Sequence, residues 1–524
     1  EPMLKLAWEP EGTVYNRFEA KFGYTEFDSD ETYLGLTEAD FRSNPNRRYN
    51  STRFDTINTE QYRTYLRHLI QPNEDWTVTS TGYFNYFKRA WYKLDASAAG
   101  GTFRTLSETL AGQHGAAELN VLKGTQAGRL RVRNNKRAYF GAGLDHTHQV
   151  EFETGSVQHT LEGGYRLHYD QAKRFQNDDI FTMDGGGNVT NIAFGPVGSQ
   201  DNRLGESWAH AFHVQDTIEI GALTLTPGMR YEHVDIRRID RRPGAGRIFS
   251  KSATHDLYAG GMGIGYQIND HLSAFGSAYR GFAIPDPNSS IDSNLGPEES
   301  LAAEVGMRYD NQTGFSVEGI FFTTFYSDLI VDSNAGGGGG GVTENAGDVD
   351  VYGGELAIAY DHGLSQGWAL KTPVRVAFTY TDARFSSGAS SIGGGGGPVE
   401  SIFSGAAEGN RVPYIPEYQI TATAGLEYDR YSLSLIGTYV PETFATGSNT
   451  HSQVRPDGVL DSRFGTTDSY FVMDLAASVQ LVKWAKLLGG VKNITGDEYI
   501  VSRIPHGPRP GAPRLFYVGA EVEF

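Results

Sequence analysis

The chain closes with "FYVGAEVEF" (516–524), and this stretch decides which fold to expect. Apolar residues occupy positions 516, 518, 520, 522 and 524, and between them stand Tyr517, Gly519, Glu521 and Glu523. Side chains on a strand alternate between its two faces, so one face of this strand is apolar and the other is polar. Such a strand fits a membrane barrel with a polar lumen, and it also fits the amphipathic edge of a soluble sheet.

The same alternation recurs along the whole chain. Clear examples are "WTVTSTGYFNYF" (76–87), "VQHTLEGGYRLHYD" (157–170), "HLSAFGSAYRGF" (271–282), "YQITATAGLEY" (418–428) and "YFVMDLAASVQLV" (470–482). No stretch combines a sustained helical period with capping residues. The sequence therefore predicts an all-β fold.

The connections between these strands alternate between two kinds. Short turns are "QPNED" (71–75), "EIGA" (219–222), "QIND" (267–270), "YDRYS" (428–432) and "LVKWAK" (481–486). Long polar or glycine-rich connections cover 28–57, 92–135, 171–204, 332–348, 386–416 and 444–467. Short turns at one end and long loops at the other are typical of a transmembrane antiparallel β-barrel in a Gram-negative outer membrane. We therefore expect the face of Phe516 to meet lipid and the face of Tyr517 to meet the lumen.

Composition excludes several classes of function. The 524 residues include no cysteine, which rules out disulfides and thiolate metal sites. A net charge of −18 argues against nucleic acid as a partner. The mean hydropathy of −0.41 is compatible with a barrel, because only every second strand residue faces lipid. No signal peptide is visible, because the sequence from Glu1 on looks like mature protein.

Several motifs, taken together and in order, resemble TonB-dependent outer-membrane receptors. They are "YRGFAIPDPNSSIDSNLGPEESLAAEVGMRYD" (279–310), "ENAGDVDVYGGELAIAYD" (344–361), "VPYIPEYQ" (412–419) and "VKNITGDEYIVSRIPHGPRPGAPRLFYVGAEVEF" (491–524). The first hundred residues, with "DETYLGLTEADFRSNPNRRYNSTRFD" and "FKRAWYKLD", look most like the ferric-citrate branch of that family.

This resemblance implies a 22-stranded barrel, plugged by an N-terminal domain, that imports a ferric chelate such as ferric citrate. The TonB energy-coupling complex would act through the plug. We count about nineteen strands over residues 1–524, all of them barrel, and expect the plug and about three strands to lie upstream because bacterial barrels have even strand counts. Outer-membrane lipid and lipopolysaccharide are the further expected partners. The alternative is a plugless passive pore, natural or engineered.

Three glycine runs stand out: "DSNAGGGGGGVTEN" (332–345), "SSIGGGGGPVES" (391–401) and the shorter "DGGGN" (184–188). Strand counting places all three in outer loops. Such runs are costly to order. We interpret them as non-native, either engineered loop replacements or placeholders for unassigned residues.

A polycarboxylate chelate needs fixed positive charge near the outer mouth, and arginine supplies it through bidentate contacts. Strand alternation points Arg166 and Arg230 into the lumen, and Arg174, Arg203, Arg237 and Arg503 lie at or just above the outer rim. These six are the candidate ligand-binding residues. The alternative is that lumen arginines only pair with lumen carboxylates.

Other charged or histidine-bearing stretches carry weaker signals. Arg47 and Arg48 could attract anions, contact lipopolysaccharide phosphates or be merely solvated. His146 and His148 share a strand face but need a third ligand to hold a metal. We expect no cofactor and no enzymatic activity, because the sequence shows no catalytic constellation.

Overall fold

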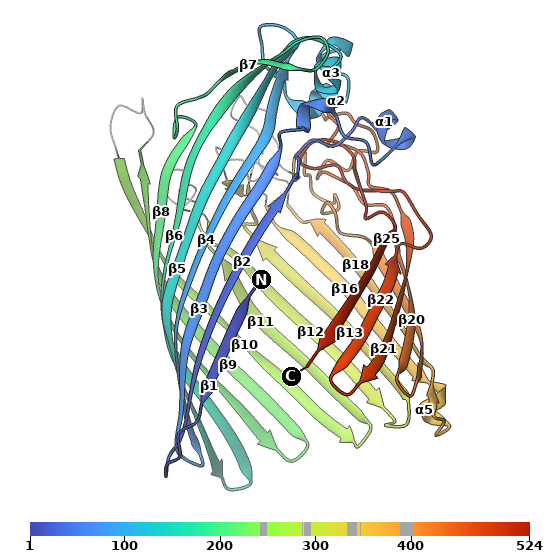
Figure 1. The fold of residues 1–524 in the computed structure, drawn as a ribbon. Coiled ribbons are helices and arrows are strands. Elements are labelled where there is room, and N and C mark those ends of the chain that lie inside the picture. Colours follow the sequence, from blue (N-terminus) through green and yellow to red (C-terminus); the bar gives the residue numbers. More distant parts are fainter. Residues whose placement is uncertain are drawn as a thin grey trace.

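A computed structural model describes residues 1–241, 249–285, 287, 295–332, 343–345, 347–387 and 402–523. The chain forms one tall, curved antiparallel sheet, with long loops and most of the short helices gathered at one end (Figure 1). Short turns join the strands at the opposite end, as the sequence predicts.

Strands make up most of the described structure. The strands of the main sheet are β1 (Met3–Trp8), β2 (Tyr15–Ser29), β3 (Thr56–Asn73), β4 (Trp76–Ala98), β5 (Gly128–Thr154), β6 (Val157–Met183), β7 (Val189–Ala193), β8 (Asp201–Ile220), β9 (Leu223–Asp240), β10 (Phe249–Asn269), β11 (Leu272–Ala283), β12 (Glu298–Asp310), β13 (Phe315–Ser327), β16 (Val349–Asp361), β17 (Leu370–Lys371), β18 (Pro373–Phe385), β19 (Tyr418–Tyr428), β20 (Tyr431–Val440), β21 (Tyr470–Val482), β22 (Ala485–Lys492) and β25 (Leu515–Val522). Outside that sheet lie β14 (Ile330–Asp332), β15 (Thr343–Asn345), β23 (Ile500–Ser502), β24 (Arg509–Pro510), α1 (Glu38–Ser43), η1 (Asn50–Thr52), α2 (Leu106–Leu110), α3 (Ala116–Lys123) and α5 (His362–Ser365).

Each long strand pairs antiparallel with the next one along the chain, from β1 to β25. Nineteen strands build this wall, and β7 and β17 are short additions to it. The sequence-based estimate of about nineteen antiparallel strands is therefore confirmed.

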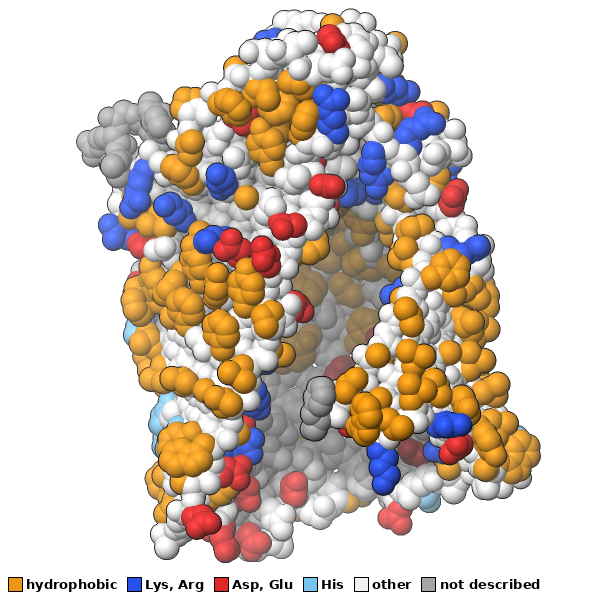
Figure 2. Space-filling model, in the orientation of Figure 1, with side chains coloured by type: hydrophobic (Ala, Val, Ile, Leu, Met, Phe, Trp, Pro, Cys, Tyr) orange, Lys and Arg blue, Asp and Glu red, His pale blue; other side chains and the backbone are white. Residues whose placement is uncertain are grey.

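The wall leaves an opening between β1 and β25. Among the described residues, β1 pairs with β2 alone and β25 with β22 alone. Figure 2 looks through this opening onto the inner wall. With an odd number of alternating strands, β1 and β25 run in the same direction, so an odd number of further strands would be needed for antiparallel closure. The expected upstream strands and plug remain a prediction.

The two faces of the wall differ as the alternation predicts. Large apolar side chains are exposed on the outer face, among them Leu66 (67%), Met229 (65%) and Phe321 (73%). The inner face carries ionic clusters, such as Glu19 with Arg17 and Lys5. An apolar outer band around a polar interior is the arrangement of an outer-membrane barrel.

The strands β4, β5 and β6 extend further than the sequence predicts. The connections expected at 92–135 and 171–204 are shorter, because β4 continues to Ala98, β5 begins at Gly128 and β6 continues to Met183. Twenty-seven residues of strand span about 90 Å, well beyond a bilayer. Polar runs at 133–136 and 176–179 interrupt the alternation above the membrane, so these strand ends resemble loops in sequence.

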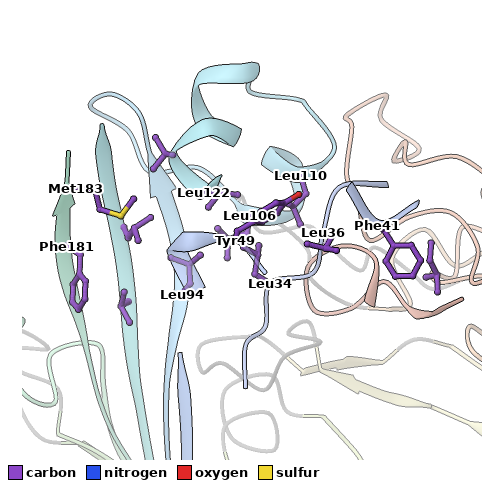
Figure 3. Close-up of a cluster of buried hydrophobic side chains, with 14 residues drawn as sticks. Leu34, Leu36, Phe41, Tyr49, Leu94, Leu106, Leu110, Leu122, Phe181 and Met183 are labelled. Atoms are coloured by element: carbon purple, nitrogen blue, oxygen red, sulfur yellow. The ribbon is translucent and has the colours of Figure 1, made fainter. Parts of the chain in front are cut away.

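A hydrophobic cluster organises the loops around these projecting ends. Leu36, Phe41, Leu106, Leu122 and Leu130 are at most 1% exposed and belong to one packed cluster (Figure 3). The cluster joins α1, α2 and α3 to β4, β5 and β6. Burial of this apolar surface holds the outer loops in a defined arrangement. Within the described residues, no helix is long and apolar enough to cross a membrane.

Of the three glycine runs, the structure describes only the one at 184–188 in full. The run at 391–401 and most of the run at 332–345 lie outside the described residues. The run at 184–188 forms a turn in which the Asp184 carboxylate accepts hydrogen bonds from the amides of Gly186 and Asn188, each at 2.9 Å. Gly187 has φ of +77°, and a Cβ there would lie 2.9 Å from the Gly124 carbonyl oxygen. Glycine at 187 thus has a structural reason, which the sequence interpretation did not foresee.

Candidate functional site

Loops from the two ends of the chain meet at the outer mouth. We call residues 30–55, 99–127, 441–469 and 493–514 the loop cap. Arg42 bonds both carboxylate oxygens of Asp468 at 2.6 and 2.7 Å, and Glu38 pairs with Arg503 at 2.9 Å. These contacts tie the loop after β2 to the loops around β22, across the opening in the wall.

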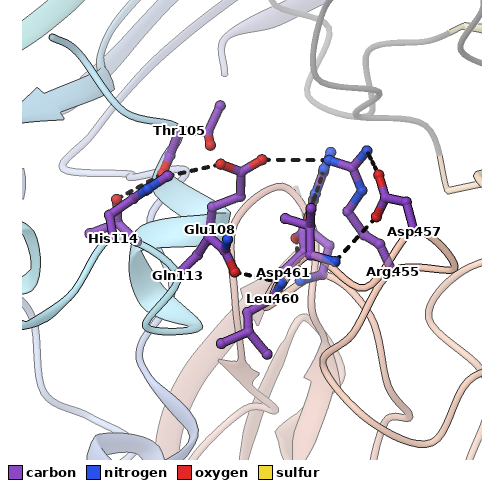
Figure 4. A network of polar contacts seen from close by, with 11 residues as sticks. Thr105, Glu108, Gln113, His114, Arg455, Asp457, Leu460 and Asp461 are labelled. Atoms are coloured by element: carbon purple, nitrogen blue, oxygen red, sulfur yellow. Dashed lines mark hydrogen bonds and ion pairs between the residues drawn. The ribbon is translucent and has the colours of Figure 1, made fainter.

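A second set of cap contacts involves the segment that carries α2 (Figure 4). Glu108 pairs with His114 at 2.9 Å and with Arg455 at 3.5 Å, and Gln113 accepts a hydrogen bond from the Leu460 amide at 3.0 Å. The cap therefore links segments that lie about 350 residues apart in the chain.

Buried charge lies beneath these contacts. Asp461 and Arg463 pair through three side-chain hydrogen bonds of 2.5, 3.0 and 3.2 Å, and their side chains are 0% and 3% exposed. Burial lowers the pKa of His506 to about 3, and the positive charges of Arg463 and Lys93 act in the same direction. His506 is therefore neutral at physiological pH.

Asp55 is a buried carboxyl group whose pKa is raised by burial, whereas burial lowers the pKa of His506. It accepts hydrogen bonds from the Thr32 hydroxyl at 2.6 Å and from the Leu94 amide at 2.8 Å. Burial raises its pKa to about 7, although the two hydrogen bonds and Lys93 oppose that rise. Asp55 thus anchors the loop after β2 to the end of β4, and its carboxyl group is protonated at mildly acidic pH.

This shift predicts that the anchor weakens as pH rises. Because the pKa of Asp55 is higher in the folded state, its ionisation favours the unfolded state. The free energy of unfolding therefore falls as the pH rises from about 4, the pKa in the unfolded chain, to about 7, the pKa in the folded protein. The total loss is at most about 4 kcal/mol. Limited proteolysis of the loop after β2 should therefore be faster at pH 8 than at pH 5. In Asp55→Asn that difference should shrink, whereas in Asp184→Asn, which changes an exposed turn, it should persist.

A row of arginines crosses the inner wall below the cap. Four arginines on neighbouring strands lie directly opposite one another. In order across the wall they are Arg89 on β4, Arg137 on β5, Arg174 on β6 and Arg203 on β8. Residues that are directly opposite share a face and have Cβ atoms about 5 Å apart. Trp208 and Phe212 of β8 are exposed on the outer face, and alternation places Arg203 on the lumen face. We call these four residues the arginine row.

Two members of the arginine row share one carboxylate, and a third has donors that no described residue satisfies. Asp201 forms a bidentate pair with Arg203 and lies 3.8 Å from Arg174. The Nε and one Nη of Arg89 are buried and have no hydrogen-bond partner among the described residues. A buried guanidinium with open donors is costly unless an anion satisfies them. The row is therefore the best candidate for an anion-binding site in the described structure.

The six arginines predicted from sequence fall into different places. Arg174 and Arg203 come together in the arginine row. Arg166 lies lower in the lumen, where its Nε donates to the Tyr83 hydroxyl at 3.0 Å. Arg230 is paired with Glu232 at 2.8 Å. Arg237 alternates with the buried Ile236 and lies on the outer face, and Arg503 is buried in the loop cap with Glu38.

Sequence reasoning missed Arg89 and Arg137, half of the row. Arg89 precedes and Arg137 follows the connection expected at 92–135, so both lie outside the predicted loop. Their position an odd number of residues from outward-facing Phe84 and Phe140 was the available signal.

The structure also shows where the weaker candidates, Arg47, His146 and His148, lie. Arg47 pairs within the loop cap with Asp40 at 2.6 Å, and Asp40 also pairs with Lys123 at 2.9 Å. His146 and His148 contact each other through Nε2 atoms at 3.0 Å, and His148 stacks on Trp76 on the outer face. Among the described residues, no group of three or more metal-ligating side chains is assembled.

Residues 8–494 match a family described as "TonB dependent receptor-like, beta-barrel". This match covers most of the chain and agrees with the strand count and the polar lumen. The chain belongs to this TonB-dependent receptor family. Its members are outer-membrane receptors and not enzymes.

Solved structures support the fold at low sequence identity. The barrel resembles the ferric citrate transporter FecA in its unliganded form, with a TM-score of 0.74, 19% identity, and coverage of 100% of this chain and 69% of that one. It also resembles the siderophore receptor PiuA from Acinetobacter baumannii, with a TM-score of 0.71, 14% identity, and coverage of 97% and 73%. The copper transporter OprC matches with a TM-score of 0.54, 10% identity, and coverage of 100% and 80%. Identities this low establish the receptor fold and leave the ligand to be argued from the site.

Proposed function

We propose that this TonB-dependent receptor imports an anionic ferric chelate of polycarboxylate type, such as ferric citrate, across the outer membrane of a Gram-negative bacterium. The observation that carries the proposal is the arginine row with the open, buried donors of Arg89. Carboxylate groups on a chelate match guanidinium donors in charge and in bidentate geometry.

The position of the row suits capture of a ligand from outside. It lies on the lumen face below the loop cap, and Trp91, over which the Arg89 guanidinium lies at 5.7 Å, is beside it. A ligand that passes the cap would first meet this concentration of positive charge. Transport beyond the row would depend on a plug and on TonB, as in the rest of the family.

Binding of ferric citrate to the detergent-purified receptor, measured by calorimetry, tests the proposal. Replacing Arg89 and Arg137 together with glutamine should weaken binding about tenfold to a hundredfold, since each charged hydrogen bond contributes about 1.5–3 kcal/mol and some partners remain. Arg89→Lys should retain more affinity than Arg89→Gln. A matched control is the pair Arg308→Gln and Arg375→Gln, on β12 and β18 near the periplasmic turns.

Two results would contradict the proposal. One is equal affinity of the wild type and the Arg89 and Arg137 double variant for ferric citrate. The other is a steady conductance in planar bilayers that ferric citrate does not change, which would favour the passive pore. A neutral ferric hydroxamate serves as the comparison ligand, and its binding should not depend on these arginines.

A further inference from the structure

A second group of cations lies on the lumen face below the arginine row. It comprises Lys21, Arg63, Tyr65, Tyr83 and Arg166 of β2, β3, β4 and β6, and we call it the lower cation patch. Lys21 lies directly opposite Tyr65, and Tyr65 lies directly opposite Tyr83. Tyr83 precedes the Arg89 of the row by six residues on β4, which is about 20 Å along the strand. The patch is therefore separate from the row and lies deeper in the lumen.

Contacts across the strands bring the side chains of the patch together. Arg166 donates from Nε to the Tyr83 hydroxyl at 3.0 Å, and its guanidinium carbon lies 5.4 Å from the Tyr83 ring centroid. The Arg63 side chain lies over Gly23, since a Cβ at Gly23 would be 3.0 Å from the Arg63 Nε. Gly23 is two residues from Lys21 on the same face of β2. Two guanidinium groups and one ammonium group thus border one stretch of wall that tyrosines line.

Few carboxylates balance the charge of the lower cation patch. Neither Lys21 nor Arg63 forms an ion pair with another residue in the described part of the chain. Glu19, two residues from Lys21 on the same face, is already paired with two cations of β1 and β2, at 3.2 and 2.8 Å. Asp145 lies opposite Arg166, but its carboxylate accepts from a threonine hydroxyl at 3.2 Å. The patch therefore retains positive charge that an anion can neutralise.

The wall between the arginine row and the patch has little to block an anion. Two lumen-facing residues of β5 on this route are glycines, Gly141 and Gly143. A Cβ at Gly141 would meet only the His168 Cε1 within 4 Å, at 3.8 Å, so the wall is bare there. A Cβ at Gly143 would lie 2.4 Å from the Tyr83 hydroxyl oxygen, so glycine lets Tyr83 lie across β5. One acid, Asp170, borders the route and lies 3.6 Å from the His168 Nε2.

The opposite charge prevails on the lumen face further round the wall. β12, β13 and β16 each carry one glutamate on the face that alternates with exposed residues such as Val305 and Phe321: Glu304, Glu318 and Glu355. An anion in the lumen is therefore attracted to the wall of β2 to β6 and repelled from that of β12 to β16.

Distance explains why one cationic site is not enough. At physiological ionic strength, the attraction between exposed charges fades over about 8 Å. The separation of about 20 Å between row and patch is more than twice that length. An anion that leaves the arginine row is thus held again only when it meets new cations. Passage through a pore is fast when several sites of moderate strength follow one another.

We propose that the lower cation patch is a second binding site for the anionic chelate, which the ligand occupies after it leaves the arginine row. Guanidinium and ammonium groups, together with tyrosine hydroxyls, donate the hydrogen bonds that carboxylate oxygens accept. This inference rests on the proposed function. It gives Lys21, Arg63 and Arg166 a role in the rate of transport and none in capture from outside.

Initial rates of uptake of radiolabelled ferric citrate, in cells that express the full receptor, test this inference. Arg63→Gln with Arg166→Gln should lower the maximal rate about threefold to tenfold, because the ligand loses the site that it enters next. The Kd for ferric citrate, measured by calorimetry on the purified receptor, should stay within about twofold of the wild type, because the arginine row is intact. Arg63→Lys with Arg166→Lys should recover most of the rate, since it restores the charge.

Two further variants show whether the position of the lost charge matters. Arg89→Gln with Arg137→Gln, in the arginine row, should raise the Kd and the half-saturating concentration of uptake. The matched control is Arg308→Gln with Arg375→Gln, which removes two cations from the lumen face of β12 and β18 and should leave the maximal rate unchanged.

Three results would overturn the second site. One is a wild-type maximal rate in Arg63→Gln with Arg166→Gln, and another is an equal loss of rate in the control on β12 and β18. The third is a loss of rate that comes with lower thermal stability of the purified receptor, which would mean that the patch holds an acidic face of the expected plug. Failure of the wild type to bind ferric citrate would instead contradict the proposed function, and the second site with it.

Discussion

Replacing Asp461 with alanine should destabilise the loop cap by about 3–5 kcal/mol, because it leaves the buried Arg463 guanidinium without its carboxylate. Asp461 accepts from the Arg463 side chain and also from the Arg463 backbone amide at 3.0 Å. Both side chains are almost completely removed from solvent. Water therefore cannot replace the lost partner unless the cap opens.

Hydrogen exchange of the amides in 441–469 measures this effect directly. Local opening should become more than a hundredfold more frequent in Asp461→Ala. The matched control is Asp457→Ala, which breaks a 2.7 Å ion pair with Arg455. The Asp457 side chain is 53% exposed, so its loss should cost less than about 1 kcal/mol of stability.

A double variant separates the buried charge from other causes. If the uncompensated guanidinium causes the loss, Asp461→Ala with Arg463→Met should recover much of the stability that Asp461→Ala loses. If the double variant is as unstable as the single one, the carboxylate matters for its backbone contacts instead. Equal exchange in Asp461→Ala and the wild type would show that the pair does not stabilise the cap.

The membrane-spanning part of the fold could be predicted from sequence because two signals agree there. The lipid outside and the polar lumen impose strict alternation on strands such as β19 and β21, and each turn has a recognisable composition. Nineteen strands and the assignment of the Phe516 face followed from these signals alone.

Above the membrane the alternation is interrupted. On β5 the polar run 133–136 breaks it, although Leu130 and Val132 alternate with Arg131 beyond that run, so the strand end resembles a loop in sequence. The loop cap depends on contacts between residues such as Arg42 and Asp468, which are 426 positions apart. No local pattern reports such a pair.

The face assignment itself has a sharp test at Leu66. On β3 the outer face runs from Tyr62 through Leu66 to Ile70, and nine residues are about the length that a tilted strand needs to cross the hydrocarbon. Leu66 lies at the centre of this segment and is 67% exposed. On a soluble protein, a change at so exposed a position usually alters stability by less than about 0.5 kcal/mol.

In a bilayer the expected result is the opposite. Leu66→Arg should cost about 2–4 kcal/mol of unfolding free energy in lipid vesicles, because an arginine at mid-depth must be drawn out of water. Thr79→Arg is the matched control, since Thr79 on β4 has the lumen-facing parity of Tyr83 and should tolerate the charge within about 1 kcal/mol. Urea titration of both variants measures the two losses of unfolding free energy. Equal tolerance at the two positions would mean that the apolar face does not meet lipid, and the soluble edge-strand alternative would return.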